Sequence, residues 1–126
     1  MFVEYNPNPD EKSVGDCVVR AITKVLDMTW EDAYVELCLQ GYMMHDMPSS
    51  NAVWGAYLKR NGFKREILSN SCADCYTIED FTKEFPKGVY VVCTGTHAAA
   101  VIDGNYYDSW RSGSTYRFAK CTCNTR

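Results

Sequence analysis

The dipeptide Asp103-Gly104 separates two runs of residues that have strand character, His97–Ile102 and residues 105–110. Asp-Gly between two such runs is a strong signal for a two-residue hairpin turn, because both central residues of that turn need a positive φ. Val89–Thr94 is a further apolar run rich in β-branched residues, and residues 115–119 have the composition of a fourth strand. The C-terminal half is therefore predicted to form an antiparallel sheet.

The N-terminal half shows helical spacing instead. Apolar residues follow Asp16, an expected N-cap, at intervals of three and four and predict a helix over Cys17–Leu26. Other helix signals extend from Thr29 to Gly41, from Ser49 or Ser50 to Gly62, and from Thr77 towards Pro86, with a short strand over 63–68. Residues 1–13 carry two Asn-Pro steps and are predicted to be extended. Helices followed by a sheet indicate an α+β fold, with the helices packed on the sheet, in one domain spanning 1–126.

Composition narrows the class of partner and the compartment. The chain has 126 residues, a net charge of −3 and a pI near 5.3, which do not favour nucleic-acid binding. It contains no apolar run of membrane-spanning length and begins with no secretory signal, so a cytoplasmic protein without a membrane partner is expected. In a reducing cytoplasm, seven cysteines point to thiol reactivity or metal binding rather than to disulfides.

Cys17 occupies the first position of a predicted helix. The helix dipole and the unpaired N–H groups there favour negative charge, which lowers a thiol pKa and makes the thiolate a better nucleophile. The same N–H groups suit a developing oxyanion. The alternative interpretation is that Cys17 packs as a small buried apolar residue, as most free cysteines do.

A candidate base and its orienting acid lie on the predicted hairpin. Of the two histidines, His45 lies in a polar, Met-rich loop, whereas His97 begins a strand and suits a general base. If the turn has two residues, Ile102 pairs with Asn105, and Asp108 lies on the same face as His97, diagonally about 7 Å away. A turn one residue longer would move Asp108 to the opposite face. The spacing therefore predicts a Cys-His-Asp arrangement of the kind found in thiol enzymes.

The stretches GDCVVRA and THAAAVIDGNYYDSW together resemble the papain-like cysteine peptidase fold, and within it compact bacterial and phage proteins similar to C39-type peptidases. YNPNP followed by GDCVVRAI also resembles uncharacterised proteins of tailed phages and their bacterial hosts. The resemblance implies a triad of Cys17, His97 and Asp108 that needs no cofactor. The family usually has a Gln about six residues before the Cys, where this chain has Glu11, so Asn8 or Asn6 is the expected second oxyanion donor.

The resemblance implies a thiol hydrolase that cleaves an amide, peptide or isopeptide bond in a peptide or protein substrate. One alternative is a weakly active or inactive interaction protein on the same fold, phage-encoded and acting on a host factor in the host cytoplasm. Another is an acyltransferase that uses the same triad. The oligomeric state is left open.

Two further groups of residues have alternative interpretations. Trp110 faces His97 in the predicted register and is the favoured groove residue, whereas Trp54 and Tyr57 have the spacing of core residues. Two cysteine pairs supply zinc-type ligands, but the short second pair matches no common zinc motif, and reduced cysteines are expected instead. These pairs are Cys72 with Cys75 and Cys121 with Cys123.

Overall fold

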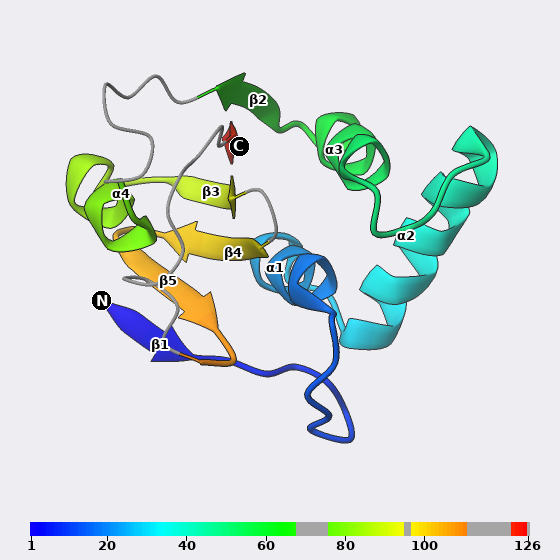
Figure 1. The fold of residues 1–126 in the computed structure, drawn as a ribbon, viewed down its shortest axis with the longest axis horizontal. Coiled ribbons are helices and arrows are strands. Elements are labelled where there is room, and N and C mark those ends of the chain that lie inside the picture. The colour runs from blue at the N-terminus through cyan, green and yellow to red at the C-terminus, as the bar shows by residue number, and fades with distance from the viewer. Residues whose placement is uncertain (68–75, 95–96, 111–121, 126) are drawn as a thin grey trace.

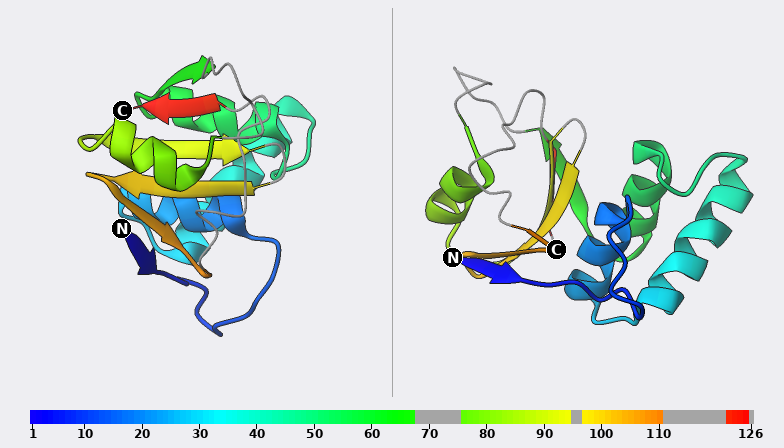
Figure 2. Two further views of the ribbon diagram at one scale, coloured as in Figure 1. Left: turned by 60° about the vertical axis from the view of Figure 1, so that its left-hand side comes forward. Right: turned by 60° about the horizontal axis from the view of Figure 1, so that its bottom comes forward.

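The computed structural model describes residues 1–67, 76–94, 97–110 and 122–125, and these form an α+β structure (Figure 1). Its helices are α1 (Cys17–Leu26), α2 (Trp30–Met44), α3 (Asn51–Arg60) and α4 (Ile78–Glu84). Its strands are β1 (Phe2–Glu4), β2 (Lys64–Ile67), β3 (Val89–Thr94), β4 (His97–Ile102), β5 (Asn105–Asp108) and β6 (Thr122–Thr125). Helices α1, α2 and α3 lie on one side of the sheet and α4 lies on the other (Figure 2).

The strands form one sheet in the order β1-β5-β4-β3-β6-β2. β1 runs parallel to β5, and the other neighbouring pairs are antiparallel. The C-terminal strands pair antiparallel as predicted, but the complete sheet is mixed, because it also includes the N-terminal strand β1. The difference arises because the first residues of the chain, predicted only to be extended, pair with the edge of β5.

The hairpin between β4 and β5 has the predicted register. Asp103 has φ 48° and Gly104 has φ 80°, so both central residues of the turn have the positive φ that this turn type needs. Ile102 pairs with Asn105, and the ladder continues to Ala100 opposite Tyr107. This register is confirmed, and it brings the end of β5 back to the start of β4.

Helix α1 packs mainly on β4, and this contact determines where the site lies. The buried face of the helix includes Ile22 and Val25, and the strand on which it packs contains three consecutive buried alanines, Ala98, Ala99 and Ala100, whose side chains alternate between the two faces of the sheet. Small side chains let the helix approach the strand closely. Because α1 and β4 both begin at the same end of this contact, the first residue of the helix lies beside the first residues of the strand.

Most predicted elements are present, with differences at their ends. Helix α2 continues past Gly41, where its end was predicted, to Met44. Gly41 packs closely against the loop that follows the helix, since a Cβ there would lie 2.6 Å from the backbone oxygen of Asp46. The glycine therefore allows a close approach rather than ending the helix. Strands β1 and β6 were not predicted, and the strand expected over 115–119 lies outside the described residues.

Within the described residues, every helix is too short or too polar to cross a lipid bilayer.

Candidate active site

The Cys17 side chain is positioned by the N-terminus of α1 and the start of β4. It is partly buried and lines the same cavity as His97 and Ala98. Burial raises the pKa of Cys17, but hydrogen-bond donation from the His97 side chain and the Ala98 backbone, with the positive charges of His97 and Arg20, lowers it below that of an ordinary thiol. The environment of Cys17 therefore favours the thiolate.

His97 connects the thiol to a buried carboxylate. Its Nε2 lies 2.5 Å from Oδ2 of Asp108, and Asp108 is 1% exposed. Burial alone would lower the pKa of His97, but the hydrogen bonds and negative charges of Asp108 and Cys17 raise it to about 9. Because Nε2 is bonded to Asp108, Nδ1 is the ring nitrogen left for the sulfur. A thiolate beside an imidazolium is the arrangement that a nucleophilic cysteine requires.

Arg20 is a member of this cluster that the sequence reasoning missed. It lies on α1, is 7% exposed, and donates from Nη2 to Oδ1 of Asp108 at 3.1 Å. Its Nη1 donates to Oδ1 of Asp16, whose Oδ2 accepts from Trp30 Nε1 at 2.9 Å. Asp16 and Arg20 are four residues apart on a helix, and this spacing was the available signal for a pair.

The same contacts correct the role expected of Asp16. It occupies the N-cap position of α1, but its side chain makes no capping hydrogen bond. Asp16 is 6% exposed, and a buried carboxylate is stabilised more by a guanidinium and an indole N–H than by a backbone amide alone. Asp16 therefore anchors Arg20 instead of capping the helix.

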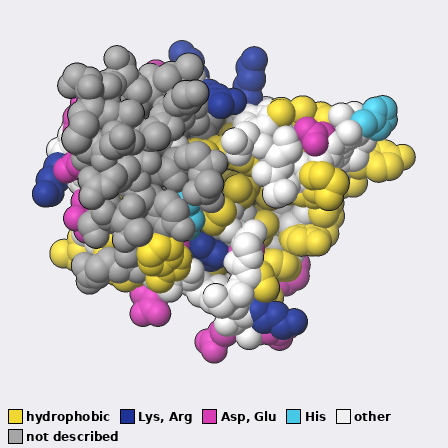
Figure 3. Space-filling view, viewed as in Figure 1, with side chains coloured by type: hydrophobic (Ala, Val, Ile, Leu, Met, Phe, Trp, Pro, Cys, Tyr) yellow, Lys and Arg dark blue, Asp and Glu magenta, His cyan; other side chains and the backbone are white. Residues whose placement is uncertain are grey.

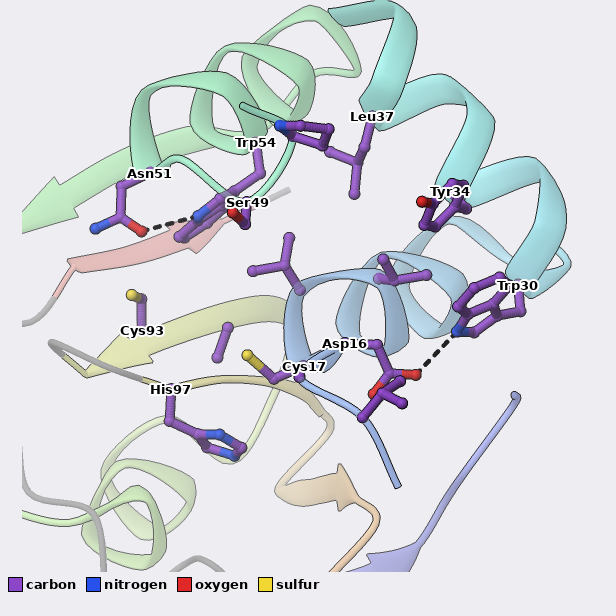
Figure 4. A pocket seen from close by; sticks show the side chains of 16 residues that line it. Asp16, Cys17, Trp30, Tyr34, Leu37, Ser49, Asn51, Trp54, Cys93 and His97 are labelled. Carbon is purple, nitrogen blue, oxygen red and sulfur yellow. Dashed lines mark hydrogen bonds between the residues drawn. The ribbon is translucent and has the colours of Figure 1, made fainter. Parts of the chain in front are cut away.

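A cavity of about 560 Å³ opens beside the thiol (Figure 4). Its lining comes from the start of α1, from α2, from the beginning of α3 and from β3 and β4. In Figure 4, Leu37 and Trp54 lie across the cavity from Cys17 and His97. On the outer surface, hydrophobic side chains gather over α2 (Figure 3), where Tyr34 and Val35 are about half exposed. The thiol is thus reached through a largely apolar space.

Cys93 also lines this cavity, but its pKa is shifted in the opposite direction to that of Cys17. It is 9% exposed, and burial together with the negative charge of Cys17 raises its pKa to about 11, against a smaller lowering effect of Arg65. Cys93 is therefore a protonated, weakly reactive thiol near neutral pH.

The remaining predicted site residues lie apart from the cavity lining. Trp110 is 43% exposed, and its ring centroid lies 6.0 Å from that of His97. Asn6 Oδ1 accepts from the backbone N–H of Asn8, and Asn8 Oδ1 accepts from Asp10 and Lys12. These asparagines hold turns of the N-terminal segment, and the cavity lining includes neither of them, nor Glu11.

Three of the four cysteines of the alternative zinc site, Cys72, Cys75 and Cys121, lie outside the described residues. Of Cys123 only the backbone is described, as part of β6. The described residues contain no cluster of three or more His, Cys, Asp or Glu side chains able to hold a metal ion.

Comparison of the chain with known protein families, with curated proteins and with solved structures gave no match. Its function has to be argued from the site.

Proposed function

We propose that this protein is a papain-like thiol hydrolase that cleaves an amide, peptide or isopeptide bond through Cys17, His97 and Asp108. One observation carries the proposal: a partly buried thiol at a helix N-terminus and a histidine line the same cavity, and that histidine is held at 2.5 Å by a buried carboxylate. Three residue types suited to acyl transfer thus meet in the order nucleophile, base and orienting acid.

Acylation begins with the thiolate–imidazolium pair. The Cys17 sulfur attacks the acyl carbon, an S–C bond forms, and the carbonyl π electrons move onto oxygen. As the carbonyl re-forms, the C–N bond breaks, and the His97 imidazolium gives its proton to the leaving nitrogen. The products are a free amine, a Cys17 thioester and a neutral imidazole.

Deacylation reverses the role of the histidine. Neutral His97 takes a proton from water while the water oxygen attacks the thioester carbon. The S–C bond then breaks, the acyl group leaves as a carboxylic acid, and the thiolate–imidazolium pair is restored. Asp108 stays ionised throughout and stabilises the imidazolium whenever it forms.

The oxyanion that forms in both steps needs hydrogen-bond donors. The backbone N–H of Cys17 is one of the unpaired amides at the start of α1, and the helix dipole adds positive potential there. The second donor predicted from the sequence, Asn8 or Asn6, would have to give up a position in which its side-chain oxygen holds the N-terminal turns.

A labelled iodoacetamide, read out by mass spectrometry of each cysteine, tests the proposal. We expect Cys17 to react at neutral pH faster than the other cysteines, and His97→Ala to abolish this advantage. Equal reactivity of Cys17 in both proteins would refute the thiolate–imidazolium pair and favour the interaction protein.

Hydrolysis and transfer are then separated by adding an amine acceptor to an ester substrate. Release of the free acid supports the hydrolase, and release of only the acylated amine supports the acyltransferase.

A further inference from the structure

We infer that the cavity beside Cys17 selects substrates whose acyl side carries a large apolar group, an inference that rests on the proposed function. The cavity volume of about 560 Å³ lies within the range of small-molecule sites. Its lining includes Leu37, Pro48 and the aromatic rings of Trp30, Tyr34 and Trp54. Such surfaces gain free energy by burying apolar atoms of a ligand.

The charged side chains described in this lining are already paired with other side chains. Among the described residues of the lining, the charged side chains are Asp16, His97 and the Cys17 thiolate, which is paired with His97. Asp16 is bonded to Arg20 and Trp30, and His97 to Asp108. The indole N–H of Trp54 is likewise occupied, because it donates to Oδ1 of Asn51 at 3.0 Å. A charged group entering the cavity would lose its hydration, and the charged side chains described in the lining are already engaged with one another or with buried partners.

The proposed chemistry decides which side of the substrate fills the cavity. The leaving nitrogen receives its proton from His97, so it must lie next to that ring. The acyl remainder then extends from the sulfur away from His97, towards Leu37 and Tyr34, which lie beyond Cys17 as seen from His97 in Figure 4. Trp110, whose ring lies beside His97, is on the leaving-group side of the thiol.

An apolar acyl group has two chemical sources, an amino-acid residue such as leucine or phenylalanine and an alkyl chain. Chloromethyl ketones test both, because the thiolate displaces chloride and forms an S–C bond while the side chain lies on the acyl side. We would compare N-acetylated ketones bearing Leu, Phe, Asp or Lys side chains with an alkyl chloromethyl ketone of similar length. Each rate constant is divided by that for free cysteine, and iodoacetamide gives the reactivity of Cys17 without a side chain.

The expected result is that the Leu and Phe ketones alkylate Cys17 at least about tenfold faster than the Asp and Lys ketones. A faster reaction of the alkyl ketone than of the Leu ketone assigns the cavity to alkyl chains, and the reverse order assigns it to amino-acid residues. Either order supports an apolar acyl group.

A matched pair of variants tests whether the cavity is responsible. Tyr34 lines the cavity, is 49% exposed and stacks on Trp30, and an arginine there keeps a planar group on the indole while adding a charge. Tyr42 lies on the same helix, is 80% exposed and is not part of the lining. We expect Tyr34→Arg to reduce the preference for Leu over Asp, and Tyr42→Arg to leave it unchanged.

The outcomes separate this inference from the proposed function. If Cys17 shows His97-dependent reactivity with iodoacetamide but reacts equally with apolar and charged ketones, the inference is wrong and the proposed function stands. If Cys17 reacts as an ordinary thiol with iodoacetamide, the proposed function fails and the inference fails with it.

Discussion

The Nε2 atom of His97 lies 2.5 Å from Oδ2 of Asp108, although the two residues are on different strands. The other carboxylate oxygen of Asp108 accepts from Arg20 at 3.1 Å and from the backbone N–H of Ser109 at 2.8 Å. With both oxygens bonded, the carboxylate has one orientation, and the imidazole bonded to it is held with Nδ1 available to Cys17. The orientation of the base is therefore fixed before any substrate binds.

Alkylation of Cys17 as a function of pH gives the first prediction. Because hydrogen bonds and charges outweigh burial at Cys17, we expect a midpoint below that of an ordinary thiol, and His97→Ala should move it upward. Cys93 lines the same cavity and is the internal control, since its pKa is raised to about 11 and it should stay unreactive near neutral pH. Equal midpoints for the two cysteines would contradict the prediction.

Two substitutions of Asp108 distinguish the effect of its negative charge from the effect of its hydrogen bond to His97. Asp108→Ala removes both, and we expect hydrolysis of a model substrate to fall roughly 10²–10⁴-fold. Asp108→Asn keeps an oxygen able to accept from Nε2–H but loses the negative charge, so the pKa of His97 should fall below about 9 and activity should fall less. The pKa is measured by NMR titration of the His97 ring. Equal losses in both variants, with an unchanged titration, would contradict this role.

Arg20 should contribute to stability because it separates two buried carboxylates. The side chains of Arg20, Asp16 and Asp108 are each at most 8% exposed, so Arg20→Met removes the guanidinium that two buried carboxylates share. We expect the free energy of unfolding to fall by about 3–5 kcal/mol, measured by urea denaturation.

Two further variants make this measurement specific. Adding Asp16→Asn to Arg20→Met removes one of the two carboxylate charges that lost the guanidinium and should recover part of the loss. Arg60→Met is the surface control, because Arg60 and Glu36 are about half exposed and 3.7 Å apart, and its cost should stay below about 1 kcal/mol. Similar costs at Arg20 and Arg60 would show that the buried cluster adds no stability.

His97 should make the stability of the fold depend on pH. Its pKa is raised to about 9 in the folded protein from about 6.5 in an unfolded chain, so the folded state binds the proton more tightly. This contribution is fully present below about pH 6.5 and is lost as pH rises through about 9. The difference in unfolding free energy between wild type and His97→Ala should therefore shrink from pH 6 to pH 10. A difference that stays constant across this range would contradict the raised pKa.

The sequence was sufficient where a local pattern determines the structure. Helical spacing after Asp16 predicts α1 with its observed bounds, and Asp103-Gly104 fixes the hairpin register that brings His97 and Asp108 together. The pairing of Phe2 with Tyr106 in β1 and β5 could not be predicted, because it joins distant segments without a local signal.

Arg20 could not be placed for a related reason. A charged residue within the apolar stretch VVRAI predicts a solvent-facing position on a helix. The partner of Arg20, Asp108, is 88 residues away in the chain. Only the tertiary contact of α1 with β4 and β5 brings that carboxylate under the helix. The same contact turns Asp16 from an N-cap into a partner of Arg20.

The ionic groups of the site form a row in which the sign of the charge alternates: Cys17, His97, Asp108, Arg20 and Asp16. With the thiolate and the imidazolium present, the row carries one net negative charge. In the proposed acylation the thiolate becomes a neutral thioester and the imidazolium becomes a neutral imidazole, while the other members keep their charges. The net charge of the buried row is therefore the same before and after acylation. Acylation thus adds no ion that the protein interior would have to stabilise.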